Sequence, residues 1–186
     1  MKNILLYLSA FVPMYVLILV KQSIEMLIGN IKTNWLNIVV LVFLVVVILL
    51  GLIGLYVEIH SDNKNCKVVK LISKQNTTDQ HFLGYFSLFV LFSITFDLSK
   101  VSMLVVFVLI LIMIGIVYVK NKLFYINPFL NILGYDFYEI TYEEKGKEKK
   151  RRIFHKGELV VGKKYCLKIK DDNFSFFDEK WKRRRL

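Results

Sequence analysis

The sequence predicts a membrane protein built of four transmembrane helices, followed by a small all-β domain of the SH3-like or β-meander type. Composition is the first observation: 55% of the 186 residues are hydrophobic, and the mean hydropathy is +0.49. Long apolar runs follow one another through the first 119 residues, and a chain of this length has too little interior to bury them all. After Gly134 the pattern changes to alternating apolar and polar residues, which is typical of β-strands.

Four apolar segments account for the predicted transmembrane helices. The clearest is Leu36–Val57, 22 residues without a charge, which at about 1.5 Å per residue spans a hydrocarbon core of about 30 Å. Pro13 removes a backbone hydrogen bond from the first segment and predicts a kink there. We favour a retained helix over a signal peptide, because only Lys2 precedes this segment and no small-residue cleavage site follows it. The predicted spans are residues 3–20, 36–57, 82–96 and 101–119.

Three polar segments connect these spans. Residues 21–35 are predicted to form a short loop along the membrane interface, with a tryptophan as its anchor. Residues 58–81 form a polar loop, in which Cys66–Ser73 is predicted to be a short strand or helix. Asp97–Lys100 predicts a tight turn, so the third and fourth spans form a helical hairpin. The predicted domains are therefore a transmembrane domain (1–122), a connector (123–134) and a cytoplasmic basic β domain with its tail (135–186).

Two glycines in the second predicted span and the two cysteines of the chain are interpreted as structural residues. Gly51 and Gly54 lie near the end of a predicted span, and their spacing is not that of the usual dimerisation motif. They could allow another helix to approach closely, but we prefer to interpret them as two small residues near a helix end. Cys66 and Cys166 are a hundred residues apart and cytoplasmic in the predicted topology, so we expect reduced thiols without a bridge.

The distribution of charge predicts the orientation of the chain. The net charge is +11, and residues 120–186 hold 18 of the 26 Lys and Arg but 10 of the 15 acidic residues. With the N-terminus, the 58–81 loop and the tail inside, 23 Lys and Arg lie inside and three lie outside. The excess of positive charge on cytoplasmic segments therefore favours a multi-pass membrane protein with both termini cytoplasmic.

The tail begins with a connector and continues as strands. Asn127-Pro128 predicts the start of a short helix, because proline is favoured at the first helical position. After Gly134, Tyr138 and its neighbours alternate in a strand pattern, and further glycines mark turns. Four or five short strands follow from this pattern. A β unit of about 50 residues is marginally stable by itself, so we expect it to pack on a partner or a second copy.

Two basic runs are the candidate binding surfaces. The first is predicted to be a hairpin tip and the second is the C-terminal tail. The preferred interpretation is a charge that orients the protein and contacts anionic lipid headgroups. An acidic protein partner is the second interpretation, and direct nucleic-acid binding is disfavoured because aromatic residues are not interleaved with the charges. The candidate residues are Lys147, Lys149, Lys150, Arg151, Arg152, Lys182, Arg183, Arg184 and Arg185.

No arrangement of residues in the sequence predicts catalysis. The histidines His60, His81 and His155 are scattered, and no phosphate loop, nucleophile elbow or zinc-protease motif occurs. We therefore expect no enzyme activity, no cofactor and no metal. The predicted spans carry no charge at depth, which argues against an ion-coupled transporter. An oligomeric pore stays open as an alternative, because a hydrophobic constriction gates by dewetting.

The segment Asn127–Glu139, NPFLNILGYDFYE, carries a family resemblance. An asparagine-proline pair, a leucine two residues later and a glycine-tyrosine pair follow the last predicted span. In this junction and in its four spans followed by strands, the chain resembles the KwaA family, the membrane subunit of the Kiwa anti-phage defence system. The connector residues that match are Asn127, Pro128, Gly134 and Tyr135.

The resemblance implies a role without catalysis. Members of this family are implied to be membrane-embedded sensors of phage infection that form homo-oligomers and bind a soluble cytoplasmic effector, KwaB. The implied mechanism is a change in helix packing, passed through the connector to the β domain. Other four-span defence proteins instead damage the membrane, so a pore-forming or depolarising effector is the alternative.

Overall fold

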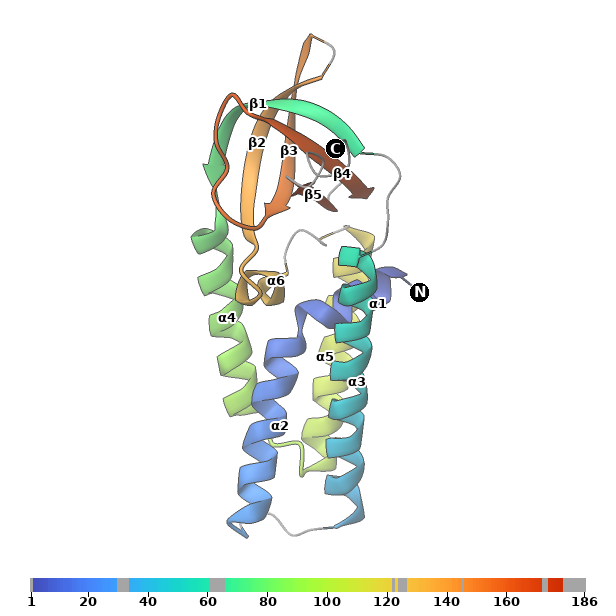
Figure 1. Cartoon of the computed structure of the whole chain (residues 1–186). Coiled ribbons are helices and arrows are strands. Elements are labelled where there is room, and N and C mark those ends of the chain that lie inside the picture. Colours follow the sequence, from blue (N-terminus) through green and yellow to red (C-terminus); the bar gives the residue numbers. More distant parts are fainter. Residues whose placement is uncertain are drawn as a thin grey trace.

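The computed structural model describes residues 2–29, 34–60, 66–121, 123, 127–144, 146–171 and 174–178. An elongated bundle of helices carries a β-barrel at one end, and the N-terminus lies near that same end (Figure 1). The helices are α1 Lys2–Ala10, α2 Val12–Leu27, α3 Trp35–His60, α4 Thr78–Thr95, α5 Val101–Lys120 and α6 Pro128–Ile132. The strands are β1 Cys66–Asn76, β2 Asp136–Glu144, β3 Lys147–His155, β4 Lys164–Asp171 and β5 Phe174–Asp178.

Two of the described helices, α3 and α5, are long and apolar enough to cross a membrane. Helices α1 and α2 pass the same test together, but they are bent by 52° at a break. The break falls at Phe11, and Pro13 lies in the first turn of α2, so the predicted kink is confirmed. Among the residues that the structure describes fully, α4 contributes the apolar helix Leu83–Thr95, which is shorter than a full span. Four spans were predicted. The described residues contain two helices that could cross a membrane, or three spans if the bent α1–α2 pair counts as one, so four spans are not confirmed.

Helix α2 continues beyond the predicted end of the first span. The loop expected over residues 21–35 is wrong for Lys21–Leu27, which belong to α2. Ile18 and Gln22 are both buried, so the inward face of the helix is maintained across this boundary. The polar residues that suggested a loop instead lie on the side and end of a helix.

Helices α1 and α2 pack closely on α3 because two glycines of α3 face them. A methyl group added at Gly54 would come within 2.5 Å of the Leu5 Cβ atom. One added at Gly51 would come within 2.9 Å of the Val12 side chain. Gly51 and Gly54 are therefore contact positions on both sides of the α1–α2 break, and the interpretation of two incidental small residues is wrong.

The end of the bundle far from the barrel is closed by polar contacts. The Lys21 ammonium group donates to the carbonyl oxygens of Ile94 and Phe96, at 3.1 and 3.2 Å. A cation at this position balances the partial negative charge at the end of α4. In the predicted turn between α4 and α5, Lys100 pairs with Asp97 at 3.3 Å.

The five strands form a closed barrel in the order β1-β2-β3-β5-β4. Neighbouring strands are antiparallel except β3 and β5, which are parallel. The barrel is therefore not a simple meander, because β5 lies between β3 and β4. Strand β1 comes from the predicted 58–81 loop, where Cys66–Ser73 was expected to be a strand or a helix, and it pairs with β2 and β4.

The interior of the barrel follows the alternation seen in the sequence. Tyr138, Ile140 and Tyr142 of β2 point inward and are buried. Tyr165 and Leu167 of β4 meet them from the opposite wall. Cys166 lies opposite Val68 of β1 and is disulfide-bonded, so the expectation of a reduced thiol is wrong for this residue.

Candidate functional site: the junction between the helices and the barrel

The short helix α6 joins the bundle to the barrel, and its ends are defined by the residues that predicted them. The Asn127 side chain accepts a hydrogen bond from the Phe129 backbone N–H at 3.2 Å, and Pro128 occupies the first helical position. The helix ends before Gly134, whose φ of +81° favours glycine. Tyr135 N–H then donates to the Leu130 carbonyl at 3.0 Å. The connector is therefore a rigid turn of helix rather than an extended linker.

Asn127 also ties this connector to the N-terminal helix. Its Nδ2 atom donates a hydrogen bond to the Ser9 Oγ atom at 2.9 Å. The Ser9 hydroxyl in turn donates to the Leu6 carbonyl at 2.7 Å. Asn127 and Ser9 are 3% and 0% exposed, so breaking this chain would leave buried polar groups without partners. The pair fixes α6 to the end of α1, beside the α1–α2 break.

Three phenylalanines on the outer face of the barrel cover the other side of the connector. Phe137 of β2 lies opposite Phe154 of β3, which lies opposite Phe176 of β5. Their ring centroids are 5.3 and 5.9 Å apart, and all three are buried. They belong to the hydrophobic cluster of the bundle and not to the barrel interior. We call Phe137, Phe154 and Phe176 the aromatic patch.

Tyr135 and Lys156 complete the edge of this patch. The Tyr135 ring meets the Phe176 ring edge to face at 5.8 Å. The Lys156 ammonium group lies 5.8 Å from the centre of the Tyr135 ring, within the range of a cation–π contact. Tyr135, the residue after Gly134, thus contacts β5 and the residue that follows β3.

The barrel is also bonded to the first turn of α4. Phe137 N–H donates to the Thr78 hydroxyl at 2.8 Å, and Thr77 N–H donates to the Phe137 carbonyl at 3.0 Å. Phe137 therefore bonds to α4 through its backbone, while its ring belongs to the hydrophobic cluster that also contains Leu130 of α6. We call the contacts of Ser9, Asn127, Phe137 and the aromatic patch the junction.

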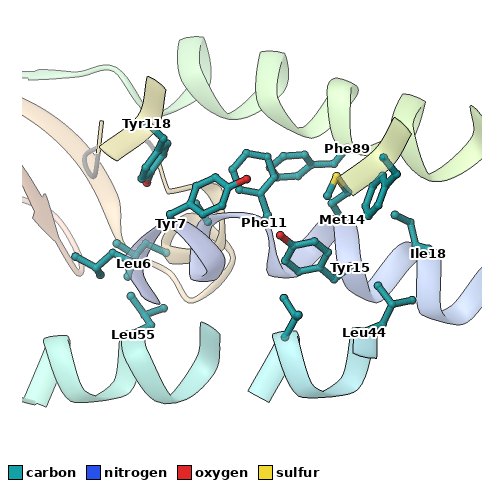
Figure 2. Packing of buried hydrophobic residues seen from close by; sticks show 14 of the residues in the cluster. Leu6, Tyr7, Phe11, Met14, Tyr15, Ile18, Leu44, Leu55, Phe89 and Tyr118 are labelled. Atoms are coloured by element: carbon teal, nitrogen blue, oxygen red, sulfur yellow. The ribbon is translucent and has the colours of Figure 1, made fainter. Parts of the chain in front are cut away.

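A row of aromatic rings continues from the junction across the bundle. The Tyr7 ring packs at a tilted angle on Phe11 and on Tyr118 of α5, with ring centroids 5.0 and 5.5 Å apart. The Phe11 ring in turn packs on Phe89 of α4, at 5.3 Å. Figure 2 shows Tyr7 and Phe11 between Tyr118 on one side and Phe89 on the other. The Tyr7 hydroxyl donates to the Leu111 carbonyl at 2.6 Å. The α1–α2 break thus contacts both α4 and α5.

The first basic run lies at the tip of the β2–β3 hairpin, as the sequence predicted. Lys149 pairs with Glu144, which Lys67 of β1 also approaches at 3.2 Å. Hydrogen bonds from these two lysines lower the pKa of the Glu144 carboxyl group below its usual value, and the same contact raises the pKa of Lys149. Exposed Lys147 and Lys150 make no ion pair with another described residue. They are the cations of this tip that stay available to a partner.

The two arginines of this run are placed differently. Arg152 pairs with Glu139 at 2.7 Å across the β2–β3 pair. Arg151 donates to the Ser175 hydroxyl of β5 at 3.1 Å. Both arginines therefore link β3 to a neighbouring strand of the barrel, Arg152 to β2 and Arg151 to β5. The second run, Lys182, Arg183, Arg184 and Arg185, lies outside the described residues.

The sequence predicts the connector side of the junction, but not Ser9 or the aromatic patch that the connector contacts. Asn127, Pro128, Gly134 and Tyr135 were singled out, and the structure brings them together between α1 and the barrel. Ser9 was seen only as one polar residue within an apolar span. The aromatic patch has a signal that could have found it: Phe137 and Phe176 occupy the strand positions that alternate with buried residues, where an outward phenylalanine requires a cover.

These features define a class of protein: apolar helices of membrane-crossing length, joined rigidly to a five-stranded barrel. The family described as "Anti-phage protein KwaA" matches residues 2–176, nearly the whole chain. The chain therefore belongs to the KwaA family of anti-phage proteins, and the resemblance noted in the connector is confirmed. No curated protein and no solved structure matches the chain.

Proposed function

We propose that this chain is a membrane-embedded sensor and scaffold of anti-phage defence, which oligomerises and docks a soluble cytoplasmic effector on its barrel. Membership of the KwaA family supports a role in defence. Two apolar helices of sufficient length support a membrane location. The role is non-enzymatic: the chain transmits a mechanical change and presents a surface. The observation that carries the proposal is the junction, in which Asn127 ties the bent N-terminal helices to the base of the barrel.

The orientation follows from where the positive charges lie. The barrel, with its basic hairpin tip, and the N-terminus lie at one end of the bundle (Figure 1). At the other end, Lys21 is engaged by the carbonyl groups at the end of α4, and Lys100 is paired with Asp97. Positive charge is enriched on cytoplasmic segments. The barrel end is therefore cytoplasmic, in the bacterial inner membrane, and both termini lie on that side.

The mechanism is a change of packing at the α1–α2 break. An infecting phage perturbs the envelope, and the helices that contact the break through Phe89 and Tyr118 shift relative to α1. Ser9 moves with α1 and carries Asn127 and α6 with it. The aromatic patch transmits this movement to β2, β3 and β5, since the packed rings do not deform continuously.

The docking surface is the tip of the β2–β3 hairpin. Lys147 and Lys150 are exposed there, and strand β3 presents them in one short stretch. An acidic surface of a soluble effector, of the KwaB kind implied by the family, is complementary to this charge. The hairpin points away from the helices (Figure 1), so these charges are better placed for a soluble partner than for the lipid headgroups of the membrane that holds the bundle.

A pore-forming or depolarising effector is the alternative function. The observation that favours it is the broken α1–α2 span, because discontinuous helices line ion and substrate pathways in transporters. A membrane-potential dye separates the two functions in cells expressing this chain alone during phage challenge. Unchanged potential supports the scaffold, and depolarisation by the chain alone contradicts it.

Affinity purification tests the scaffold directly. The full chain is extracted from bacterial membranes in mild detergent, with and without the soluble proteins encoded beside it. We expect a soluble partner at a stoichiometric amount and a complex larger than one copy of each chain. If no neighbouring protein is retained at any detergent concentration that keeps the chain folded, the docking role is wrong.

A further inference from the structure

An apolar cavity of about 350 Å³ lies beside the α1–α2 break. Its inner wall is formed by the rings of Phe11, Phe89 and Tyr118, which belong to the aromatic row. Met113 and Val117 of α5 form a second wall. The volume is within the range of about 300–1,000 Å³ that is usual for small-ligand sites. Nothing in the mechanism described above fills this space.

The cavity opens toward the outer surface of the bundle. Met113 and Val117 line it and are nevertheless 67% and 52% exposed, so they stand at its rim. In the proposed membrane location, this rim faces lipid hydrocarbon. An apolar hollow open to hydrocarbon is filled by hydrocarbon, because an empty space forfeits dispersion contacts and water finds no polar partners there.

A cation lies on the same face of α5 as the rim of the cavity, although it is not one of the lining residues. Met113, Val117 and Lys120 are spaced by four and three residues, so they share one face of α5. Lys120 is exposed and lies about one turn beyond Val117, toward the barrel. A chain bound along this face would enter the cavity with its tail and reach Lys120 with an anionic head.

We propose that the cavity binds an acyl chain of an anionic phospholipid from the leaflet on the barrel side, with the headgroup at Lys120. The inference rests on the proposed membrane location. Pro128, the first residue of α6, also lines the cavity. The lipid therefore touches both the helix break and the residue next to Asn127. Its arrival or loss changes the packing at the junction, and the lipid is the regulatory ligand of the sensor.

Photolabelling tests this binding on the purified full chain. The chain is placed in nanodiscs of phosphatidylethanolamine and phosphatidylglycerol, the latter carrying a diazirine in its acyl chain. Labelled peptides are mapped by mass spectrometry after illumination. We expect enrichment at the rim residues of α5 and at the facing turn of α4 that carries Phe89, above the level on the exposed face of α3.

A matched pair of variants isolates the cavity from the general lipid contact. Val117→Trp fills the cavity, whereas Ile116→Trp places the same ring on a neighbouring α5 residue that does not line it and is 61% exposed. Labelling of α4 falls about tenfold in the first variant, because the indole takes the volume of the acyl chain. It stays at the wild-type level in the second. Unchanged labelling in Val117→Trp overturns the proposal.

The headgroup has its own pair of variants. Lys120→Gln lowers the preference for phosphatidylglycerol over a phosphatidylcholine probe about fivefold, as expected for one cation near an anionic headgroup. Lys100→Gln, at the far turn, leaves it unchanged. Equal labelling by both probes in the wild-type chain contradicts the preference for an anionic headgroup.

If the illuminated products are cross-links to a second copy of the chain, the cavity is an oligomer contact and the proposal is wrong.

Two measurements keep this inference separate from the proposed function. If Val117→Trp does not elute as a folded protein during purification, the labelling pattern of the wild-type chain alone decides whether the cavity binds lipid. A chain that is not recovered in the membrane fraction contradicts the membrane location, and with it both proposals. A chain that is membrane-bound and protects against phage, yet shows no enriched labelling at the cavity, contradicts only the lipid site.

Discussion

The Asn127 amide donates a hydrogen bond to the Ser9 hydroxyl at 2.9 Å and joins residues 118 positions apart in the sequence. The same side chain caps α6 through the Phe129 N–H. One buried residue thus sets the start of the connector and anchors it to the N-terminal helix. A buried polar network with its partners in place specifies one arrangement of the elements that it joins. This arrangement relates the α1–α2 break to the barrel.

Replacing Asn127 by alanine should destabilise the chain. The change removes the α6 cap and leaves the Ser9 hydroxyl without its donor, for a cost of about 1–3 kcal/mol. Thermal unfolding in detergent should show a midpoint several degrees lower. Asn121→Ala is the matched control, because Asn121 is exposed just after α5. Equal midpoints for the two variants would show that the buried bond contributes nothing.

The two helical glycines Gly54 and Gly84 should respond oppositely to alanine. At Gly54 the new methyl group meets the Leu5 Cβ atom at 2.5 Å, so α1 must move away from α3. At Gly84 the added methyl group would meet no described atom within 4 Å beyond its own stretch of helix backbone, and alanine raises helix stability by about 1 kcal/mol. Unfolding midpoints should fall for Gly54→Ala and rise or hold for Gly84→Ala. A Gly54→Ala chain as stable as wild type would contradict the close α1–α3 packing.

Neutralising the exposed lysines of the hairpin tip should weaken partner docking. Lys147→Gln with Lys150→Gln removes two charges without breaking an ion pair between described residues, so the barrel should stay folded. Affinity for the soluble effector should fall about tenfold or more. Lys163→Gln with Lys164→Gln removes the same charge from exposed residues before and within β4. Equal losses of affinity in both double variants would indicate general attraction instead of this surface.

The hairpin should lose stability as the solution becomes acidic. Hydrogen bonds from Lys149 and Lys67 lower the pKa of Glu144 in the folded chain. The carboxylate therefore stabilises the fold above its ordinary pKa of 4.5, and this contribution disappears as the pH falls through the lowered folded value. Unfolding midpoints well above and well below this pH should differ less in Glu144→Gln than in wild type. Glu143→Gln, a neighbour on the same strand, is the control, and a smaller difference there as well would point to charge in general.

Much of the helical architecture is predictable because it depends on local composition. The apolar run over Leu36–Val57 becomes α3, and Pro13 produces the bend, since each effect acts within a few residues. Asn127 and Pro128 start α6 for the same reason. The alternation around Tyr138 predicts which side chains fill the barrel.

The features that the sequence did not predict depend on contacts between segments that are distant in the chain. Strand β1 completes the barrel from a loop between helices, and its apolar residues occur in pairs that do not distinguish a strand from a helix. Gly54 acquires its meaning only from Leu5 on another helix, and Ser9 only from Asn127. A single sequence holds these residues but does not show which partners they meet, so the contacts of Ser9 and Gly54 could not be predicted from it.

The most direct test of the account is the phage plating efficiency of cells carrying Ser9→Ala, with the membrane abundance of the chain and the retained effector measured in the same cells. This variant removes the hydroxyl that receives the Asn127 bond and leaves the hairpin tip untouched. If the junction transmits the signal, the Ser9→Ala chain stays in the membrane and still holds its effector, while phage plate as on cells without the chain. Full protection by Ser9→Ala at wild-type abundance would contradict transmission through the junction.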